Sequence, residues 1–136
     1  MMKILLVEDS KFLRLATERA LARSGYDVCC AADGDEALRM AQMKMPDLIL
    51  LDMLLPKMSG LDVLKALKKD PATKPIPVVV ISGMTEKNAA RLQEDGAAGF
   101  LQKSSLELDK GPERLLAEVR EIVSKLPTIE ARKTTA

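Results

Sequence analysis

Apolar runs rich in valine, isoleucine and leucine alternate along this chain with stretches in which apolar residues recur every three or four positions. The first pattern is typical of buried parallel strands and the second of helices, so the chain should consist of repeated βα units. Five strands are expected, each followed by a helix. They are predicted at Lys3–Val7, Tyr26–Ala31, Asp47–Asp52, Pro77–Ser82 and Gly99–Leu101.

Capping and turn residues place the helices between these strands. The first should begin after Asp9, turn Leu13, Ala16 and Ala20 inward, and end at Gly25, a residue suited to the left-handed conformation. The fourth carries few apolar residues, so it should be lightly anchored and is a candidate moving part. The second helix is predicted from a cap at Asp33 to about Lys44. The third, fourth and fifth are predicted at about 60–69, 86–95 and 112–126.

Polar residues of different kinds stand where four of the predicted strands end. Glu8 and Asp9 follow the first strand, and Asp52 ends the third. Ser82 ends the fourth strand, and Lys103 follows the fifth. Because open α/β sheets place their sites at the carboxyl edge, these groups should share one pocket. An acid cluster, a hydroxyl and an ammonium can together hold a divalent cation and a phosphoryl group.

Three carboxylates in one crevice need a counter-charge. At about 5 Å and an effective dielectric of about 20, each pair repels by about 3 kcal/mol. Mg²⁺ suits such a site because it takes oxygen ligands and is usually held by one or two carboxylates plus phosphate oxygens. Glu8 and Asp9 could also cap the first helix beside its dipole, and both roles can hold at once.

Composition limits the remaining possibilities. The 136 residues, 47% of them hydrophobic, suffice for one domain, expected over 1–126, with a flexible polar tail over 127–136. The 21 basic and 20 acidic residues nearly cancel, which argues against a nucleic-acid or anionic-membrane surface. No apolar stretch approaches the roughly 20 residues that span a bilayer, and nothing resembles a signal peptide. A cytoplasmic location is therefore expected.

The cysteines and the absence of histidine exclude further chemistry. Cys29 and Cys30 are adjacent on a predicted strand, so they should face opposite sides, where they are poorly placed to bridge and are expected to be buried, inert thiols. With no histidine in the chain, a zinc site is improbable and histidine-dependent triads are excluded.

The strand-end motifs, taken in order, resemble a known family. They are Val7–Ser10, Leu51–Gly60, Ile81–Gly83 and Phe100–Lys103. Together, over about residues 2–126, they resemble the receiver domain of two-component response regulators. The resemblance implies an α/β fold: a flavodoxin-like, doubly wound (βα)5 three-layer sandwich with a five-stranded parallel sheet in the order 2-1-3-4-5.

The same resemblance implies roles for the acidic residues. Asp52 would be the phosphoacceptor, because an aspartate can attack a phosphoryl group and become an acyl phosphate. Asp9 and Asp52 would ligate Mg²⁺ directly, Glu8 largely through water, and Leu54 through its backbone carbonyl. Taken alone, Asp52 could equally be a solvated acid or a helix cap.

The other implied roles concern response to phosphorylation. Lys103 and Ser82 would contact the phosphoryl oxygens, and Ser82 with Phe100 would form the switch. Phe100 could equally be ordinary core filling. The implied phosphodonor is a histidine kinase or a histidine phosphotransfer protein, and the reader is an unspecified downstream protein. The chain would be a switch, not a turnover enzyme, and either a monomer or a phosphorylation-dependent dimer.

Two departures from the family pattern matter. Ser104 stands where the family usually has proline, which leaves the shape of the loop from Ser104 to Gly111 open. Leu54 and Met84 are apolar at positions that could otherwise orient an attacking water, so slow self-dephosphorylation is predicted.

Three other functions compete with this interpretation. A haloacid-dehalogenase-type phosphohydrolase would need a second aspartate where Leu54 stands, and a flavodoxin would need a hydroxyl- and glycine-rich loop in place of Glu8–Lys11. A receiver that binds partners without phosphorylation is the third, and the presence of every pocket group argues against it.

Overall fold

The computed structural model describes the backbone of residues 2–83, 86–103, 106 and 111–126, and the side chains of all of these except 86–89. Five parallel strands alternate with five helices in this part of the chain, as predicted. The elements are β1 (Lys3–Val7), α1 (Lys11–Arg23), β2 (Asp27–Ala31), α2 (Gly34–Lys44), β3 (Leu48–Asp52), α3 (Gly60–Lys69), β4 (Val78–Ser82), α4 (Glu86–Glu94), β5 (Gly99–Gln102) and α5 (Glu113–Lys125).

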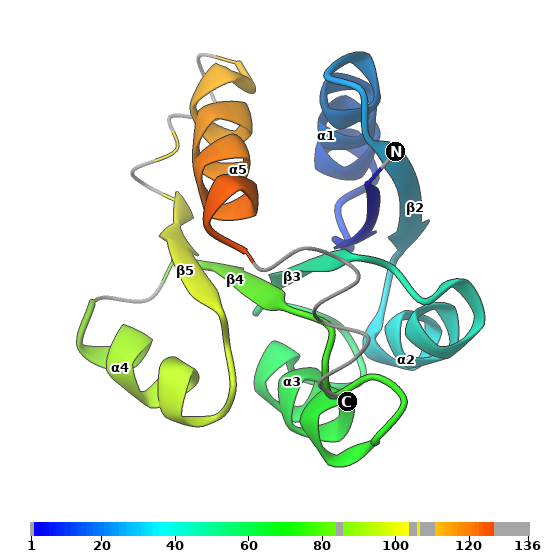
Figure 1. The fold of residues 1–136 in the computed structure, drawn as a ribbon, viewed down its shortest axis with the longest axis vertical. Coiled ribbons are helices and arrows are strands. Elements are labelled where there is room, and N and C mark those ends of the chain that lie inside the picture. Colours follow the sequence, from blue (N-terminus) through cyan, green and yellow to red (C-terminus); the bar gives the residue numbers. More distant parts are fainter. Residues whose placement is uncertain (1, 84–85, 104–105, 107–110, 127–136) are drawn as a thin grey trace.

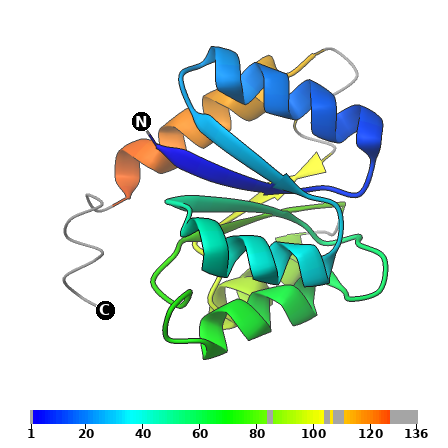
Figure 2. The same cartoon turned by 90° about the vertical axis from the view of Figure 1, so that its right-hand side faces the viewer.

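The strands form one parallel sheet in the order β2-β1-β3-β4-β5, which confirms the predicted topology. Helices α1 and α5 cover one face, and α2, α3 and α4 cover the other (Figures 1 and 2). Strands β3 and β4 are buried along their whole length. Burial on both faces explains why these strands read as continuous apolar runs without alternation.

Register brings the functional strand ends to the same edge. Val7 pairs with Leu51, the residue before Asp52, and Asp52 pairs with Ile81, the residue before Ser82. Ser82 in turn pairs with Gln102, the last residue of β5. Strand ends that are far apart in the chain therefore lie side by side, as the parallel arrangement requires.

Predicted boundaries agree with the structure to within a residue or two. Strand β2 begins one residue later than predicted because the Tyr26 amide donates to the carbonyl of Leu21, at the end of α1, at 3.2 Å. Gly25 follows α1 with φ +98°, the left-handed conformation expected of it. The Asp33 carboxylate accepts the Glu36 amide at 2.9 Å and caps α2 as predicted.

The inward face of α1 differs from the prediction. Ala16 is exposed, so its inward placement was wrong, whereas Leu13 is half-buried and Ala20 is buried. The inward stripe runs instead from Leu13 through Thr17, both half-buried, to the buried Leu21, at the i, i+4, i+8 spacing of one helix face.

The two cysteines lie on opposite faces of β2, as predicted. Cys29 packs against the cluster beneath α2 and α3, and Cys30 packs against the cluster beneath α1 and α5. Both thiols are free, but they are half-buried and not buried as predicted, because β2 is an edge strand of the sheet. The Cys30 thiol donates to a carboxylate oxygen of Glu18 at 2.8 Å, and burial raises its pKa to about 12.

The described part of helix α4 contributes little to the core. Among its described side chains, residues 90–94, Leu92 alone is buried. Helix α5, on the opposite face, buries Leu115 and Val119. In the part of the chain that the structure describes, no helix is both long and apolar enough to cross a bilayer. The tail at 127–136 lies outside the described residues.

Candidate functional site

Three carboxylates converge at the carboxyl edge of the sheet. Oxygens of Glu8, Asp9 and Asp52 all lie within 4.8 Å of one another. Glu8 and Asp52 are buried, with relative exposures of 9% and 3%, and Asp9 is exposed. The sequence prediction that negative side chains from separate stretches meet here is confirmed.

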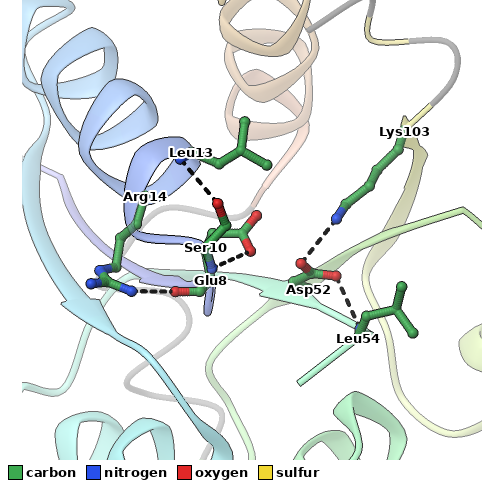
Figure 3. A network of polar contacts seen from close by, with 7 residues as sticks. All are labelled: Glu8, Ser10, Leu13, Arg14, Asp52, Leu54 and Lys103. Carbon is green, nitrogen blue, oxygen red and sulfur yellow. Dashed lines mark hydrogen bonds and ion pairs between the residues drawn. The ribbon is translucent and has the colours of Figure 1, made fainter. Parts of the chain in front are cut away.

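Asp52 is held on both of its oxygens (Figure 3). Its Oδ1 accepts the backbone amide of Leu54 at 3.0 Å, and its Oδ2 accepts the Lys103 ammonium at 3.0 Å. The Lys103 side chain is 28% exposed and that of Asp52 only 4%. A charge-assisted bond of this kind is strong in a partly dry pocket, so Lys103 compensates the charge of Asp52 and orients it.

The backbone after Asp52 is fixed by a close approach of α3. The Gly60 amide donates to the carbonyl of Met53 at 3.1 Å. A Cβ atom at Gly60 would lie 2.5 Å from the Met53 Cα and 2.8 Å from the Asp52 carbonyl oxygen. Glycine at position 60 therefore lets the first turn of α3 seat the loop that follows Asp52.

Glu8 carries the clearest electrostatic signature of the pocket. Burial, followed by a side-chain hydrogen bond and the charge of Asp52, raises the pKa of Glu8 to about 7. The Ser10 amide, which donates to a Glu8 carboxylate oxygen at 3.2 Å, and the charge of Lys103 oppose this rise. Burial is the largest cause of this rise, and the Asp52 charge adds to it, so the pocket disfavours an ionised Glu8 when no cation is bound.

The donor set of this cluster fits a hard divalent cation. Its carboxylate oxygens are the ligands that Mg²⁺ prefers, and their excess negative charge is what a cation would neutralise. Cysteine and histidine, which would favour zinc, contribute nothing to this group. The pocket can therefore hold Mg²⁺ through Glu8, Asp9 and Asp52.

Arg14 is a site residue that the sequence analysis missed. Its Nη1 donates to the carbonyl oxygen of Glu8 at 2.9 Å (Figure 3) and also to that of Asp9 at 3.4 Å. Ser10 caps α1 through its hydroxyl, which accepts the Leu13 amide at 3.4 Å. The available signal was an arginine five residues after Asp9, in the first turns of the predicted helix.

Ser82 and Phe100 lie on the β4 and β5 side of the edge. Ser82 is 2% exposed, and it helps to line a cavity of about 590 Å³ whose wall also includes Met53, Arg91 and Leu92. Phe100 is half-buried and packs against the cluster on the α2, α3 and α4 face. This packing agrees with both interpretations of Phe100, as switch residue and as core filling.

Parts of the predicted site lie outside the described residues. They include Met84, Ser104 and most of the loop that leads to Gly111. Leu54 is described, and its side chain is 72% exposed.

Comparison with known proteins gives consistent matches. A family model described as the response regulator receiver domain matches residues 4–119. The response regulator PleD of Caulobacter vibrioides is 42% identical over 103 residues, which is 74% of this chain and 22% of PleD. The alkaline phosphatase synthesis transcriptional regulatory protein PhoP of Bacillus subtilis is 46% identical over 74 residues, which is 54% of this chain and 31% of PhoP. The chain thus spans well under half the length of these two relatives.

Among solved structures, the chemotaxis response regulator CheY4 of Vibrio cholerae superposes with a TM-score of 0.80 at 32% identity. The match covers 90% of this chain and 98% of CheY4. A response regulator from Desulfuromonas acetoxidans gives a TM-score of 0.78 at 31% identity, covering 93% and 100% of the two chains.

Proposed function

Because this chain belongs to the receiver domains of two-component response regulators, we propose that it is a phosphorylation-dependent switch whose phosphoacceptor is Asp52. The observation that carries the proposal is the setting of Asp52. It is almost wholly buried, bonded to Lys103 at 3.0 Å, and within 4.8 Å of two further carboxylates. A structural acid has no need of such neighbours, whereas a phosphoacceptor that works with a cation does.

The proposed reaction is the transfer of a phosphoryl group from a phosphohistidine on a partner. A carboxylate oxygen of Asp52 attacks phosphorus, and the bond from phosphorus to the imidazole nitrogen breaks. The nitrogen keeps the bonding electron pair, and an acyl phosphate remains on Asp52. Lys103, already bonded to Asp52, is placed to compensate the charge of the phosphoryl oxygens.

Mg²⁺ is the proposed cofactor. Asp9 and Asp52 would hold it directly, Glu8 largely through water, and Leu54 through its backbone carbonyl. When bound, the ion supplies positive charge that neutralises the carboxylates and the phosphoryl oxygens.

The proposed output is a change in partner binding. Ser82 would donate to the phosphoryl group, and Phe100 would change its burial, which shifts a two-state equilibrium. The surface formed by α4, β5 and α5 would be read by a downstream protein. The proposed donor is a histidine kinase or a histidine phosphotransfer protein in the cytoplasm, and the chain acts as an interaction module, not as a turnover enzyme.

A titration with beryllofluoride, a phosphoryl mimic, tests this function. With Mg²⁺ present, we expect amide resonances around Asp52, Ser82 and Phe100 to shift in slow exchange. The Asp52→Asn variant, which is nearly isosteric, should show no such shifts. Binding of beryllofluoride to the variant as tightly as to the native chain would contradict the assignment of Asp52 and favour a receiver that acts without phosphorylation.

A further inference from the structure

Arg14 reaches back from α1 to the loop that carries two of the three acids. It is the fourth residue of α1, and side chains on a helix lean toward its N-terminus. The guanidinium therefore lies over the junction between β1 and α1, where Nη1 donates to the carbonyl oxygen of Glu8 (Figure 3) and to that of Asp9. We propose that Arg14 is a positioning residue, which fixes this backbone so that both carboxylates converge on Asp52.

Backbone hydrogen bonds hold the loop between β1 and α1 at both of its ends. The Glu8 amide donates to the Ala31 carbonyl at 3.0 Å, which ties the loop to the end of β2. The Arg14 amide donates to the Ser10 carbonyl at 2.8 Å, which starts α1. Between these two anchors lie the peptide groups of Glu8 and Asp9, and the Arg14 side chain binds both of their carbonyl oxygens.

The bonds from Arg14 act on the backbone and not on the carboxylates. Arg14 is therefore placed to set the direction of the Glu8 and Asp9 side chains without competing for their oxygens. Groups that orient the ligands of a metal commonly change its affinity by about 10- to 100-fold when they are removed. This inference rests on the proposed Mg²⁺ site.

Positioning and simple charge predict opposite results. A cation near a metal site repels Mg²⁺, so if Arg14 acted through its charge alone, removing it would tighten Mg²⁺ binding. If Arg14 acts by holding the backbone, removing it should loosen the acids and weaken binding. The sign of the change distinguishes the two roles.

The test compares Arg14→Met with Arg19→Met. Arg19 lies on the same helix, is exposed, and makes no hydrogen bond or ion pair with any residue that the structure describes, so its loss removes the same charge without the contact. Calorimetric titration with Mg²⁺ at constant ionic strength should show binding weakened by about tenfold in Arg14→Met and changed by no more than about twofold in Arg19→Met. Arg14→Lys, which keeps the charge and one donor, should fall between Arg14→Met and the native chain.

A second measurement needs no metal. In EDTA, the Glu8 and Ser10 amides should exchange hydrogen faster in Arg14→Met than in Arg19→Met, while the amides of β3 keep their native rates. Should Arg14→Met fail to fold, Arg14→Gln takes its place in both measurements.

Mg²⁺ binding by Arg14→Met as tight as in the native chain, or tighter, would overturn the inference. So would unchanged exchange at Glu8 and Ser10. If the native chain itself bound no Mg²⁺, the proposed function would fail, and the exchange rates would still decide whether Arg14 fixes the loop.

Discussion

The two walls of the pocket are built differently. On the wall formed by the ends of β1 and β3, Asp52 accepts two hydrogen bonds, Glu8 accepts the Ser10 amide, and the loop backbone is bonded to Arg14. On the wall beside α4, Leu92 alone is buried among the described side chains of the helix, and a cavity of about 590 Å³ lies next to it. One wall is fixed by directional bonds, and the other has room to rearrange.

This difference suggests how a local reaction could reach a distant surface. Phosphorylation would add charge to the fixed wall, whose residues cannot rearrange without breaking hydrogen bonds. The response would then be expressed on the α4 side, where apolar contacts are few and local opening is cheap.

The largest effect on stability should come from truncating matched leucines of α3 and α4, and it tests how firmly α4 is held on its face of the sheet. Leu64 of α3 and Leu92 of α4 are both buried in the cluster on the same face of the sheet. Leu64→Ala should lower the free energy of unfolding by about 4 kcal/mol, and Leu92→Ala by less than about 2 kcal/mol, because α4 can detach or collapse locally. Urea unfolding measures the global loss.

Amide exchange separates local from global opening in the same pair. In Leu92→Ala, the backbone amides of α4 should exchange faster while those of β3 change little. Equal global losses in the two variants, with no faster exchange confined to α4, would show that α4 is as firmly held as α3.

The next largest effect is a dependence of the free energy of unfolding on pH, which arises from Glu8 on the fixed wall when no metal is bound. The pKa of Glu8 is about 7 in the folded chain against 4.5 for an unperturbed glutamate, so the folded state binds this proton more tightly than the unfolded state. Its stabilising contribution, about 3 kcal/mol, is fully present below pH 4.5 and is lost as the pH rises through about 7. The free energy of unfolding from urea titrations in EDTA should therefore fall by most of that amount between pH 5 and pH 8.

Glu8→Gln and Mg²⁺ serve as controls for this pH effect. The variant removes the titrating proton, so most of the fall should disappear. Saturating Mg²⁺ should stabilise the native chain most above pH 7, where Glu8 is ionised. A native stability that rises with pH in EDTA over this window would contradict the account of the pocket charge.

A smaller loss of stability is expected when Lys103, which joins the two walls, is replaced. Lys103, which follows β5, bonds across the pocket to Asp52 at 3.0 Å. Lys103→Met should cost about 2 kcal/mol in EDTA, less than for a fully buried pair because the Lys103 side chain is 28% exposed. Mg²⁺ should restore much of the loss, since both cations neutralise the same acids. Thermal unfolding with and without Mg²⁺ measures this, and a loss that Mg²⁺ leaves unchanged would argue against a shared role.

The smallest effect on stability, and a kinetic one, is predicted at Leu54. Its side chain is 72% exposed, so Leu54→Asn should leave the fold intact. An amide at this position can hydrogen-bond a water beside Asp52, so the acyl phosphate should decay faster, and faster still when Met84→Glu is added. Phosphate release after removal of the donor measures the lifetime. An unchanged lifetime in the double variant would rule out the apolar pair as the cause of slow decay.

Much of the fold could be predicted because strand and helix signals agree along the chain. The apolar run before Asp52 needed burial on both faces, which only a central strand offers, and β3 has it. Because the carboxyl ends of parallel strands meet at one edge of the sheet, Glu8, Asp52 and Ser82 could be placed there before any distance was known.

Other features depend on side-chain geometry that a pattern does not contain. The Tyr26 amide donates a hydrogen bond to the end of α1, so β2 starts one residue later than predicted. Ala16 lies just outside the buried stripe of α1. The raised pKa of Glu8 arises from the depth of the pocket, and the contacts of Arg14 arise from the lean of its side chain. An arginine on an amphipathic helix is ordinarily a solvated residue, so sequence alone gave no reason to single it out.

The most direct test of the central claim is intact-mass analysis of the native chain after treatment with acetyl phosphate. With Mg²⁺, we predict the mass of one added phosphoryl group, and none when EDTA replaces the metal or when Asp52→Asn is used. An adduct that forms equally well in EDTA, or that persists in Asp52→Asn, would contradict the claim that converging carboxylates and a cation prepare Asp52 for phosphorylation.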